Sequence, residues 1–288
     1  MSGSWQDSGS QSSGHRLNLM HTASVSRLVT GVLTAVLVGV VLAFVGSGTA
    51  IAQTGTTAFS TSEPTATTDA AATQPVPDFR PTKRETYVAR LITRIGLYPK
   101  AGGGKLRGTL APWISDTGNP VELLVLNSKV LATGESWLKV RLPSRPNDAT
   151  AWIRESNVIL RKNPMRVEIS LRRHELRVFR RGHVVLRIGV ALGAAATPTP
   201  RGRFAIYQKI REVWWSPLGP WALHLTAHSN VLFEYAGGPG RVAIHGARGV
   251  LWAAAGTNPS HGCIRVPDPG IRKVVPLVSP GTPVDIVA

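Results

Sequence analysis

The feature that most constrains the fold is a strict alternation of apolar and polar residues that begins at Met165. Apolar residues occupy every other position from 167 to 171, and a polar turn follows at 172–175. After a second turn at Gly182, the alternation runs on from 184 to 190. A period of two is typical of strands with one buried and one solvated face. This region predicts an antiparallel meander with its arginines on the solvated face.

Residues 84–162 show the same pattern in shorter pieces. Apolar segments are separated by turns, among them the Gly102-Gly103-Gly104 loop. The chain holds 29 glycines and 21 prolines, which favours short strands over long helices. The segment 136–140, a Pro/Asn/Asp loop and 151–153 together resemble bacterial Src-homology-3-like barrels. We expect a small β-barrel over 84–162, in which Trp137 and Trp152 serve either the core or binding.

The N-terminal part predicts export. Residues 1–27 are rich in Ser and Gly and contain Arg16 and Arg27, and residues 28–45 are uncharged and mostly apolar. Basic residues before an apolar segment place the N-terminus in the cytoplasm. Ala50-Ile51-Ala52 is a candidate cleavage site, so segment 28–52 fits both a cleaved signal peptide and a membrane anchor. We therefore expect an exported protein that works in the extracytoplasmic cell wall, secreted or anchored.

Residues 53–83 are dominated by Thr, Ala, Ser and Pro and contain almost no large apolar side chains. Such a segment cannot bury enough surface to fold, and we interpret it as a disordered linker.

The positive charge of the chain lies in its predicted folded part. Residues 84–163 contain 13 basic and 6 acidic residues, and residues 164–288 contain 16 and 6, whereas residues 1–83 are balanced. A positive field concentrates anionic partners. Export argues against nucleic acid, so anionic cell-wall polymers are the expected partners of this charge.

One short motif contains the chemistry. Cys263 is the only cysteine, and it lies in Ser260-His261-Gly262-Cys263-Ile264-Arg265, 18 residues after His245. A thiol is a strong nucleophile as thiolate, and a nearby imidazole or cation promotes that state. A single cysteine in an exported chain cannot form an internal disulfide. Polar neighbours of this kind favour a reactive cysteine over a buried apolar one.

His245-Gly246 and the motif around Cys263 resemble the catalytic signature of the L,D-transpeptidases, with 14 residues between His245 and Ser260. The segment 197–204 resembles the Thr-Pro-x-Gly-x-Phe turn of the same family, lengthened by one Thr-Pro step. Ala247 departs from the Thr or Ser common after His-Gly. The resemblance implies a catalytic domain over 164–288, a β-sandwich with a short helix at 268–275.

The resemblance also implies a reaction. Cys263 would attack a peptidoglycan stem tetrapeptide, release D-Ala and leave a thioester, which an amine of a second stem resolves into a 3→3 cross-link. His245 is then the expected base, with His261 secondary and the Gly246 carbonyl orienting His245. The N–H groups of Gly262 and Cys263 are the expected oxyanion donors.

Neither a metal nor a cofactor is expected in this site. The H-x₃-H spacing of His224 and His228 lacks the further ligands of a zinc motif. Two alternatives remain open: an L,D-carboxypeptidase that uses water as acceptor, and a catalytically inactive wall-binding protein. The expected substrate-binding residues are Ser260, Arg265, Trp214 and Trp215.

Overall fold

The computed structural model describes residues 78–249 and 255–288. The predicted cytoplasmic tail (1–27), the signal or anchor segment (28–52) and residues 53–77 of the predicted linker lie outside the described residues. Within the described ranges, no helix is long and apolar enough to cross a membrane.

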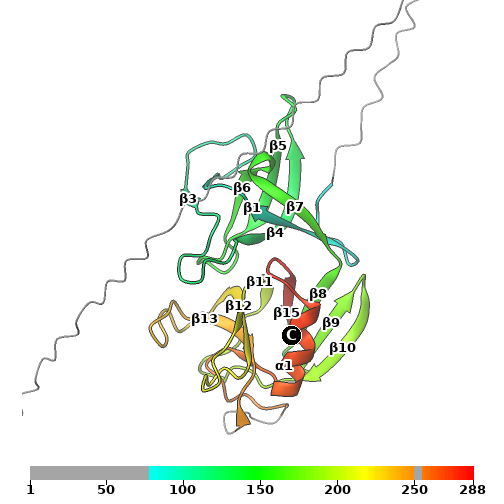
Figure 1. Ribbon diagram of the computed structural model, residues 1–288, viewed down its shortest axis with the longest axis vertical. Helices are drawn as coiled ribbons and strands as arrows, with labels where there is room; N and C mark the ends of the chain where they lie inside the picture. Colours follow the sequence, from blue (N-terminus) through cyan, green and yellow to red (C-terminus); the bar gives the residue numbers. More distant parts are fainter. Residues whose placement is uncertain (1–77, 250–254) are drawn as a thin grey trace, which may run out of the picture. The chain divides into compact units, whose positions relative to one another are not determined.

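The first part of the described chain forms a five-stranded antiparallel sheet with the strand order β6-β5-β4-β1-β7 (Figure 1). A second, two-stranded sheet pairs β2 (Ile95–Leu97) with β3 (Gly108–Leu110). The strands of the larger sheet are β1 (Thr86–Leu91), β4 (Glu122–Val130), β5 (Ser136–Arg141), β6 (Thr150–Arg154) and β7 (Val158–Asn163).

Alternate apolar residues of these strands form one core. Leu123 and Val125 of β4 and Leu138 and Val140 of β5 are buried together in it. Trp137, one position from Leu138, is also fully buried, and its Nε1 donates a hydrogen bond of 2.8 Å to a carboxylate oxygen of Glu135. Burying an indole with its N–H satisfied is the pattern of a core residue. The structural interpretation of this tryptophan therefore holds.

Phe79 and Thr82, which lie inside the predicted linker, make hydrogen bonds in the structure. Phe79 donates its N–H to the Ser128 hydroxyl at 3.1 Å, and its ring meets Tyr87 edge-on at 4.8 Å. The hydroxyl of Thr82 donates to the Glu85 carbonyl at 3.0 Å. A single large apolar residue at the end of a polar segment is enough to attach the chain to the sheet.

The C-terminal part of the chain forms a third and larger sheet. Its eight strands lie in the order β10-β9-β8-β15-β11-β12-β13-β14. The β8–β15 and β13–β14 pairs are parallel, and the other neighbours are antiparallel. The strands are β8 (Met165–Ser170), β9 (Glu175–Arg180), β10 (His183–Gly189), β11 (Gly202–Arg211), β12 (Trp221–His228), β13 (Arg241–His245), β14 (Ile264–Arg265) and β15 (Pro283–Val287).

The predicted meander is present as β8, β9 and β10, with a bulge between Val184 and Leu186. Most of its arginines are exposed as expected, and two of them are not. The side chains of Arg166 and Arg177 are only 18% and 20% exposed, because both pair with Glu168. Ion pairing within the sheet neutralises the charges of these two arginines.

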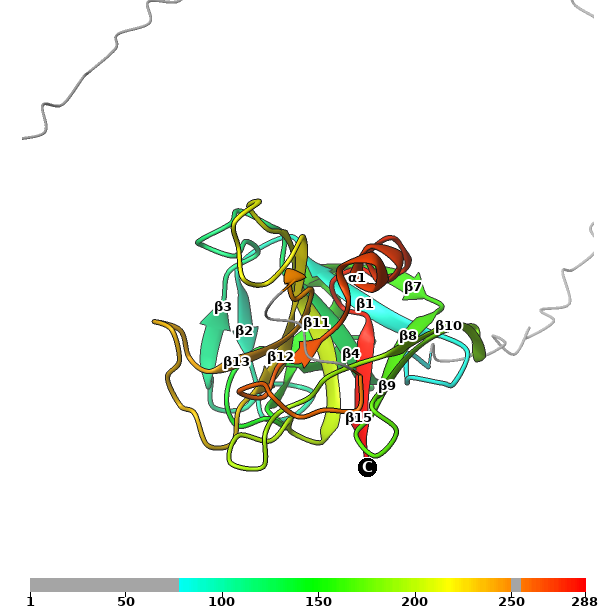
Figure 2. The same cartoon turned by 90° about the horizontal axis from the view of Figure 1, so that it is seen from below.

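A β-sandwich was expected, whereas the structure has one continuous sheet that curls around a core (Figure 2). Val167 and Ile169 of β8 are buried in the same cluster as Leu223 of β12 and Ile244 of β13. The expected helix is present as α1 (Asp268–Val274), followed by a 3₁₀ turn at Val275–Leu277. Ile271 and Val274 of α1 close the core.

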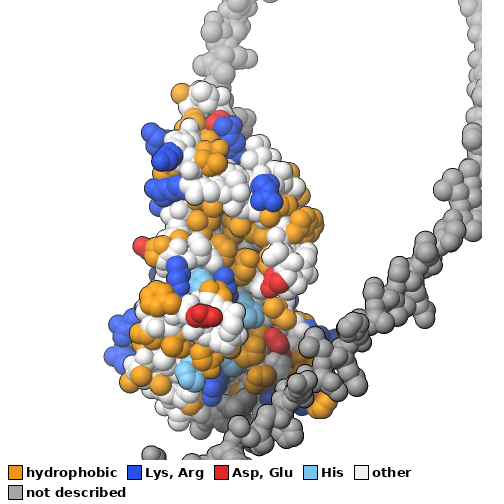
Figure 3. All heavy atoms as spheres, turned by 90° about the vertical axis from the view of Figure 1, so that its left-hand side faces the viewer, with side chains coloured by type: hydrophobic (Ala, Val, Ile, Leu, Met, Phe, Trp, Pro, Cys, Tyr) orange, Lys and Arg blue, Asp and Glu red, His pale blue; other side chains and the backbone are white. Residues whose placement is uncertain are grey.

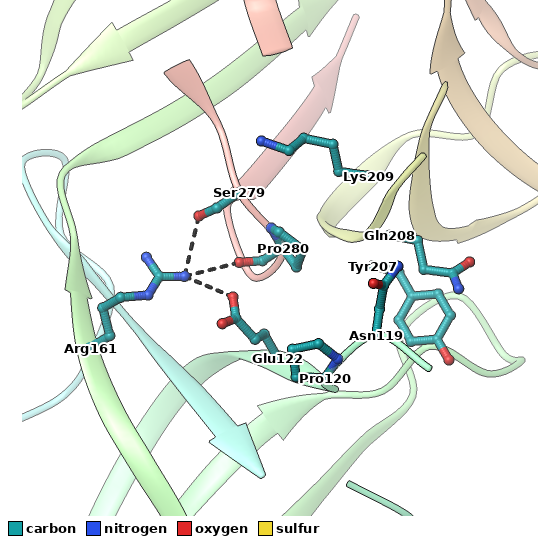
Figure 4. Close-up of a pocket in the computed structure, with 9 residues that line it drawn as sticks. All are labelled: Asn119, Pro120, Glu122, Arg161, Tyr207, Gln208, Lys209, Ser279 and Pro280. Atoms are coloured by element: carbon teal, nitrogen blue, oxygen red, sulfur yellow. Dashed lines mark hydrogen bonds and ion pairs between the residues drawn. The ribbon is translucent and has the colours of Figure 1, made fainter. Parts of the chain in front are cut away.

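Arg161 links the five-stranded sheet to the segment that precedes β15. Arg161 of β7 pairs with Glu122 at 2.8 Å and donates to the Ser279 hydroxyl at 3.2 Å and the Pro280 carbonyl at 3.3 Å (Figure 4). These groups line a cavity of about 500 Å³ together with Lys209. The Lys209 ammonium donates to two carbonyls at the end of the helical segment, so both charged donors of the cavity have protein partners.

Candidate active site

Two neighbouring strands hold the cysteine and the histidine that the sequence singles out. β13 and β14 are parallel, with Ile244 opposite Ile264 and His245 opposite Arg265. Ile244 and Ile264 are fully buried in the core. Side chains alternate between the faces of a strand, so His245, Arg265 and the preceding Cys263 project to the opposite face. Cys263 thus lies two positions before the residue opposite His245, as a diagonal neighbour across the strand pair.

Two threonines of the 197–204 segment fix the loop that precedes the cysteine. Thr199, which is buried, donates to the Gly262 carbonyl at 3.0 Å and accepts the Gly193 N–H at 2.9 Å. Thr197 donates to the Ser260 carbonyl at 3.1 Å. The Thr-Pro-Thr-Pro turn therefore holds the backbone of the Ser-His-Gly-Cys motif from one side.

Ser260 fixes the same loop from within. Its buried hydroxyl donates to the Cys263 carbonyl at 2.6 Å and accepts the Gly262 N–H at 3.1 Å. Gly262 has φ +115°, a region that favours glycine. Ser260 was expected to bind substrate, but its hydroxyl positions the loop. The Gly262 N–H was expected to bind the oxyanion, but it is already bonded to Ser260. Of the two expected oxyanion donors, the Cys263 N–H remains the better candidate.

Cys263 is half-buried, and its thiol is protonated at rest. Burial raises the pKa of the thiol above its usual range, while the Ala243 N–H and the Arg265 guanidinium act in the opposite direction. A raised pKa means that the thiolate forms only when a base accepts the proton. The site therefore needs a neutral imidazole beside the sulfur.

His245 has that property. Burial lowers the pKa of His245 to about 4, and Arg265 and His224 act in the same direction, against a hydrogen bond to Gly246 and the charge of Asp268. Its Nδ1 contacts the Gly246 carbonyl, which can only accept. The proton is therefore on Nδ1, and Nε2 carries the free lone pair that a base requires.

The segment after His245 is held by Asp268 at the start of α1. The Asp268 carboxylate accepts the N–H groups of Ala247 at 3.0 Å and Arg248 at 3.3 Å. A methyl group on Gly246 would lie 2.5 Å from this carboxylate. Since Ala247 is fully buried, a small residue at this departure from the family pattern fits the packing.

His261 contacts a residue that the sequence analysis does not single out. Its Nδ1 lies 3.2 Å from the Tyr235 hydroxyl, and the two rings stack with centroids 4.9 Å apart. Tyr235 belongs to the loop between β12 and β13, residues 229–240, and is half exposed. His261 is exposed, consistent with the secondary role expected for it.

Among the described residues, no contact joins Trp214 or Trp215 to Cys263. Trp214 and Trp215 are 77% and 64% exposed and meet edge-on at 5.6 Å. Trp214 lines a pocket with Arg248 and α1 residues. Their expected role as a wall beside Cys263 stays a prediction.

The β5–β6 loop, residues 142–149, holds the loop that carries Tyr235. The Asn147 side chain bonds both backbone groups of His228, at 2.7 and 2.8 Å, and the Asn230 side chain at 2.8 Å. Arg145 stacks on Phe233 at 4.6 Å. It also donates to three carbonyls of loop 229–240: Ser229 at 2.8 Å, Leu232 at 3.0 Å and Pro239 at 3.2 Å.

Releasing this loop should weaken the site without removing any reacting group. In an Arg145→Ala/Asn147→Ala variant we expect faster amide hydrogen exchange over 229–240 and about tenfold slower turnover, because hydrogen bonds from a charged donor are lost. Arg94→Ala, an exposed arginine in the same half of the chain, is the matched control. Unchanged exchange over 229–240 in the double variant would contradict the holding role.

Figure 3 shows one face of the surface, on which hydrophobic and histidine side chains lie between Lys and Arg. Within 78–249 and 255–288, no group of three or more His, Cys, Asp or Glu side chains is arranged to hold a metal ion.

Comparison with known proteins supports the L,D-transpeptidase catalytic-domain family for the second part of the chain. A sequence profile of that domain matches residues 164–286. A curated Bacillus licheniformis protein, YkuD, whose name assigns it provisionally to the L,D-transpeptidases, is 28% identical over 123 residues. The match covers 43% of this chain and 66% of the relative, just under two thirds of its length.

Solved structures of the same family give weaker likeness. An Enterococcus faecium L,D-transpeptidase is 21% identical with a TM-score of 0.34, covering 42% of this chain and 49% of that one. An L,D-transpeptidase from Mycobacterium tuberculosis is 17% identical with a TM-score of 0.39, covering 58% and 90%.

Proposed function

We propose that this chain is an L,D-transpeptidase that cross-links peptidoglycan stem peptides through a Cys263 thioester. One observation carries the proposal: the only cysteine lies two positions before Arg265, the residue opposite His245, and the pKa of this buried histidine is lowered to about 4. A thiol with a raised pKa beside a neutral imidazole is the pairing that acyl transfer at neutral pH requires.

The reaction follows from these groups. His245 Nε2 takes the thiol proton as Cys263 Sγ attacks the carbonyl between the diamino acid and D-Ala. The oxyanion accepts the Cys263 N–H, a contact of about 3 kcal/mol in comparable sites. His245 then gives the proton to the departing D-Ala nitrogen, which leaves the thioester. An amine of a second stem attacks the thioester and forms the 3→3 bond. His245 takes the amine proton and returns it to the sulfur.

Water in place of the amine would make the same site an L,D-carboxypeptidase. An inactive wall-binding protein is the remaining alternative, and the His245–Cys263 arrangement disfavours it. The test is incubation of the full chain with a disaccharide-tetrapeptide and mass spectrometry of the products. A cross-linked dimer lacking one D-Ala is the expected product. Tripeptide alone would favour the carboxypeptidase, and unchanged substrate would contradict both activities.

We further propose export to the cell wall, with the sheet of β1 and β4–β7 as a Src-homology-3-like unit that binds anionic wall polymers. The excess of 13 basic over 6 acidic residues in 84–163 supports this partner. Charge-led binding weakens with salt, because exposed charges are screened beyond about 8 Å at physiological ionic strength. We expect the full chain to pellet with purified wall at low salt and to be released as salt rises. Salt-independent pelleting would contradict a charge-led contact.

A further inference from the structure

Arg248 combines three unusual features. Its backbone has φ +30°, in the left-handed region that non-glycine residues rarely adopt. Its guanidinium lies over the Trp214 ring at 5.2 Å. Its Nη1 is buried and has no hydrogen-bond partner among the described residues. Strained backbone and unpaired buried donors concentrate at functional sites.

The pocket around Arg248 is rich in cations. It has a volume of about 370 Å³, and the guanidinium groups of Arg211, Arg248 and Arg272 line it. Two carboxylates, Glu212 and Asp268, also line it, and the Asp268 Oδ1 already accepts two backbone N–H groups. In the described parts of the chain, none of these three arginines has an ion pair with a carboxylate.

Several arginines of the curled sheet are instead paired with carboxylates. Arg166 and Arg177 pair with Glu168, and Arg203 pairs with Asp285 at 2.7 Å. Carboxylates of the chain neutralise these three arginines, whereas Arg241 of β13 donates to the Leu225 and Pro143 carbonyls. A buried guanidinium nitrogen left without a partner can be satisfied by an anion from outside.

The position of the pocket indicates the source of that anion. Arg248 follows His245 by three residues, so their Cα atoms lie within about 10 Å. An extended stem tetrapeptide has a similar length. A peptide whose scissile carbonyl lies at Cys263 can therefore reach the pocket with another of its groups. The planar guanidinium favours a carboxylate, which it binds through two parallel hydrogen bonds.

We propose that Arg248, with Arg211, Arg272 and Trp214, forms a pocket that binds a carboxylate of the stem peptide. This inference rests on the proposed function and adds a specificity-determining site to it. The pocket selects stems whose carboxylate is free and aligns them with Cys263, and stems in which that carboxylate is amidated bind more weakly.

The test measures equilibrium binding of a stem tetrapeptide to the full chain carrying Cys263→Ala, which prevents turnover. Adding Arg248→Gln should weaken binding at least tenfold, the usual scale for a lost charge-assisted contact. Arg248→Lys should give an intermediate loss, because it keeps the charge but not the bidentate geometry. Arg180→Gln, an exposed arginine at the end of β9, is the control and should bind as the parent.

Tetrapeptides amidated at one carboxylate at a time identify the bound group. Arg248→Gln should have no further effect on the peptide that lacks that carboxylate. Equal binding of every peptide to the Arg248→Gln and parent chains would overturn the proposal. So would Arg248-dependent binding of inorganic phosphate, at constant ionic strength, that leaves peptide binding unaffected, because the pocket would then serve phosphate groups.

Turnover separates this inference from the proposed function. If the chain with Cys263 intact fails to convert the tetrapeptide, the proposed function fails. If it converts the peptide and Arg248→Gln leaves KM unchanged, only the carboxylate pocket fails.

Discussion

Replacing Cys263 with alanine should reduce product formation to the uncatalysed background. The chain has no second thiol, so no other cysteine can take over the acyl group. Loss of the nucleophile from a unit of nucleophile and base costs most of the rate acceleration, on the order of 10⁶-fold in comparable acyl-transfer enzymes. Mass spectrometry of products from a disaccharide-tetrapeptide checks this directly.

Folding of the variant is the necessary control. Cys263 is half-buried, and removing one sulfur leaves a small cavity, so near-native thermal unfolding is expected. Cys263→Ser keeps the shape of the side chain and should be nearly as inactive, because a serine hydroxyl ionises far less readily than a thiol. Cross-linking above background in a folded Cys263→Ala chain would exclude the thioester route.

Replacing His245 with glutamine should slow acylation by about 10²-fold or more, the scale of a lost general base. His261→Gln should cost much less, since His261 is exposed and stacked on Tyr235. Single-turnover release of D-Ala measures both. A crippling effect of His261→Gln with a mild effect of His245→Gln would reverse the two roles.

The pH profile gives an independent check on the same residue. A histidine of ordinary pKa loses its basic form below about pH 6.5. Burial lowers the pKa of His245 to about 4, so its basic form persists through the range between 6.5 and 4. The acylation rate should therefore stay high from pH 6.5 towards pH 5 and fall near pH 4. An acid limb centred at pH 6.5 would show that His245 is not the group that accepts the proton.

The sequence predicts the local elements well, because local periodicity determines them. The meander that begins at Met165 and the helix that begins at Asp268 match the structure closely. The strand order could not be predicted, since β15 inserts between β8 and β11 through pairing over more than 70 residues. Such long-range pairing leaves no periodic signal in the chain. The curl of one sheet in place of a sandwich also depends on long-range pairing, so the sequence pattern does not predict it.

Some residues of the site could be predicted from the sequence, and others could not. Cys263 and His245 lie in a recognisable spacing, and their common sheet face follows from the register of β13 and β14. Tyr235 and Asp268 lie in segments without any motif, so only folding brings them to the site. The hydroxyl of Ser260 illustrates a different limit: the sequence predicts its importance but not that the backbone uses it.

Detection of the acyl-enzyme itself tests the Cys263 thioester route most directly. The full chain is mixed with stem tetrapeptide, quenched in acid within the first turnover, digested and analysed by peptide mapping. We expect a stem tripeptide bound as a thioester to the peptide that contains Cys263, removable by hydroxylamine and absent from Cys263→Ala. D-Ala release without any adduct at Cys263, or an adduct at another residue, would contradict it.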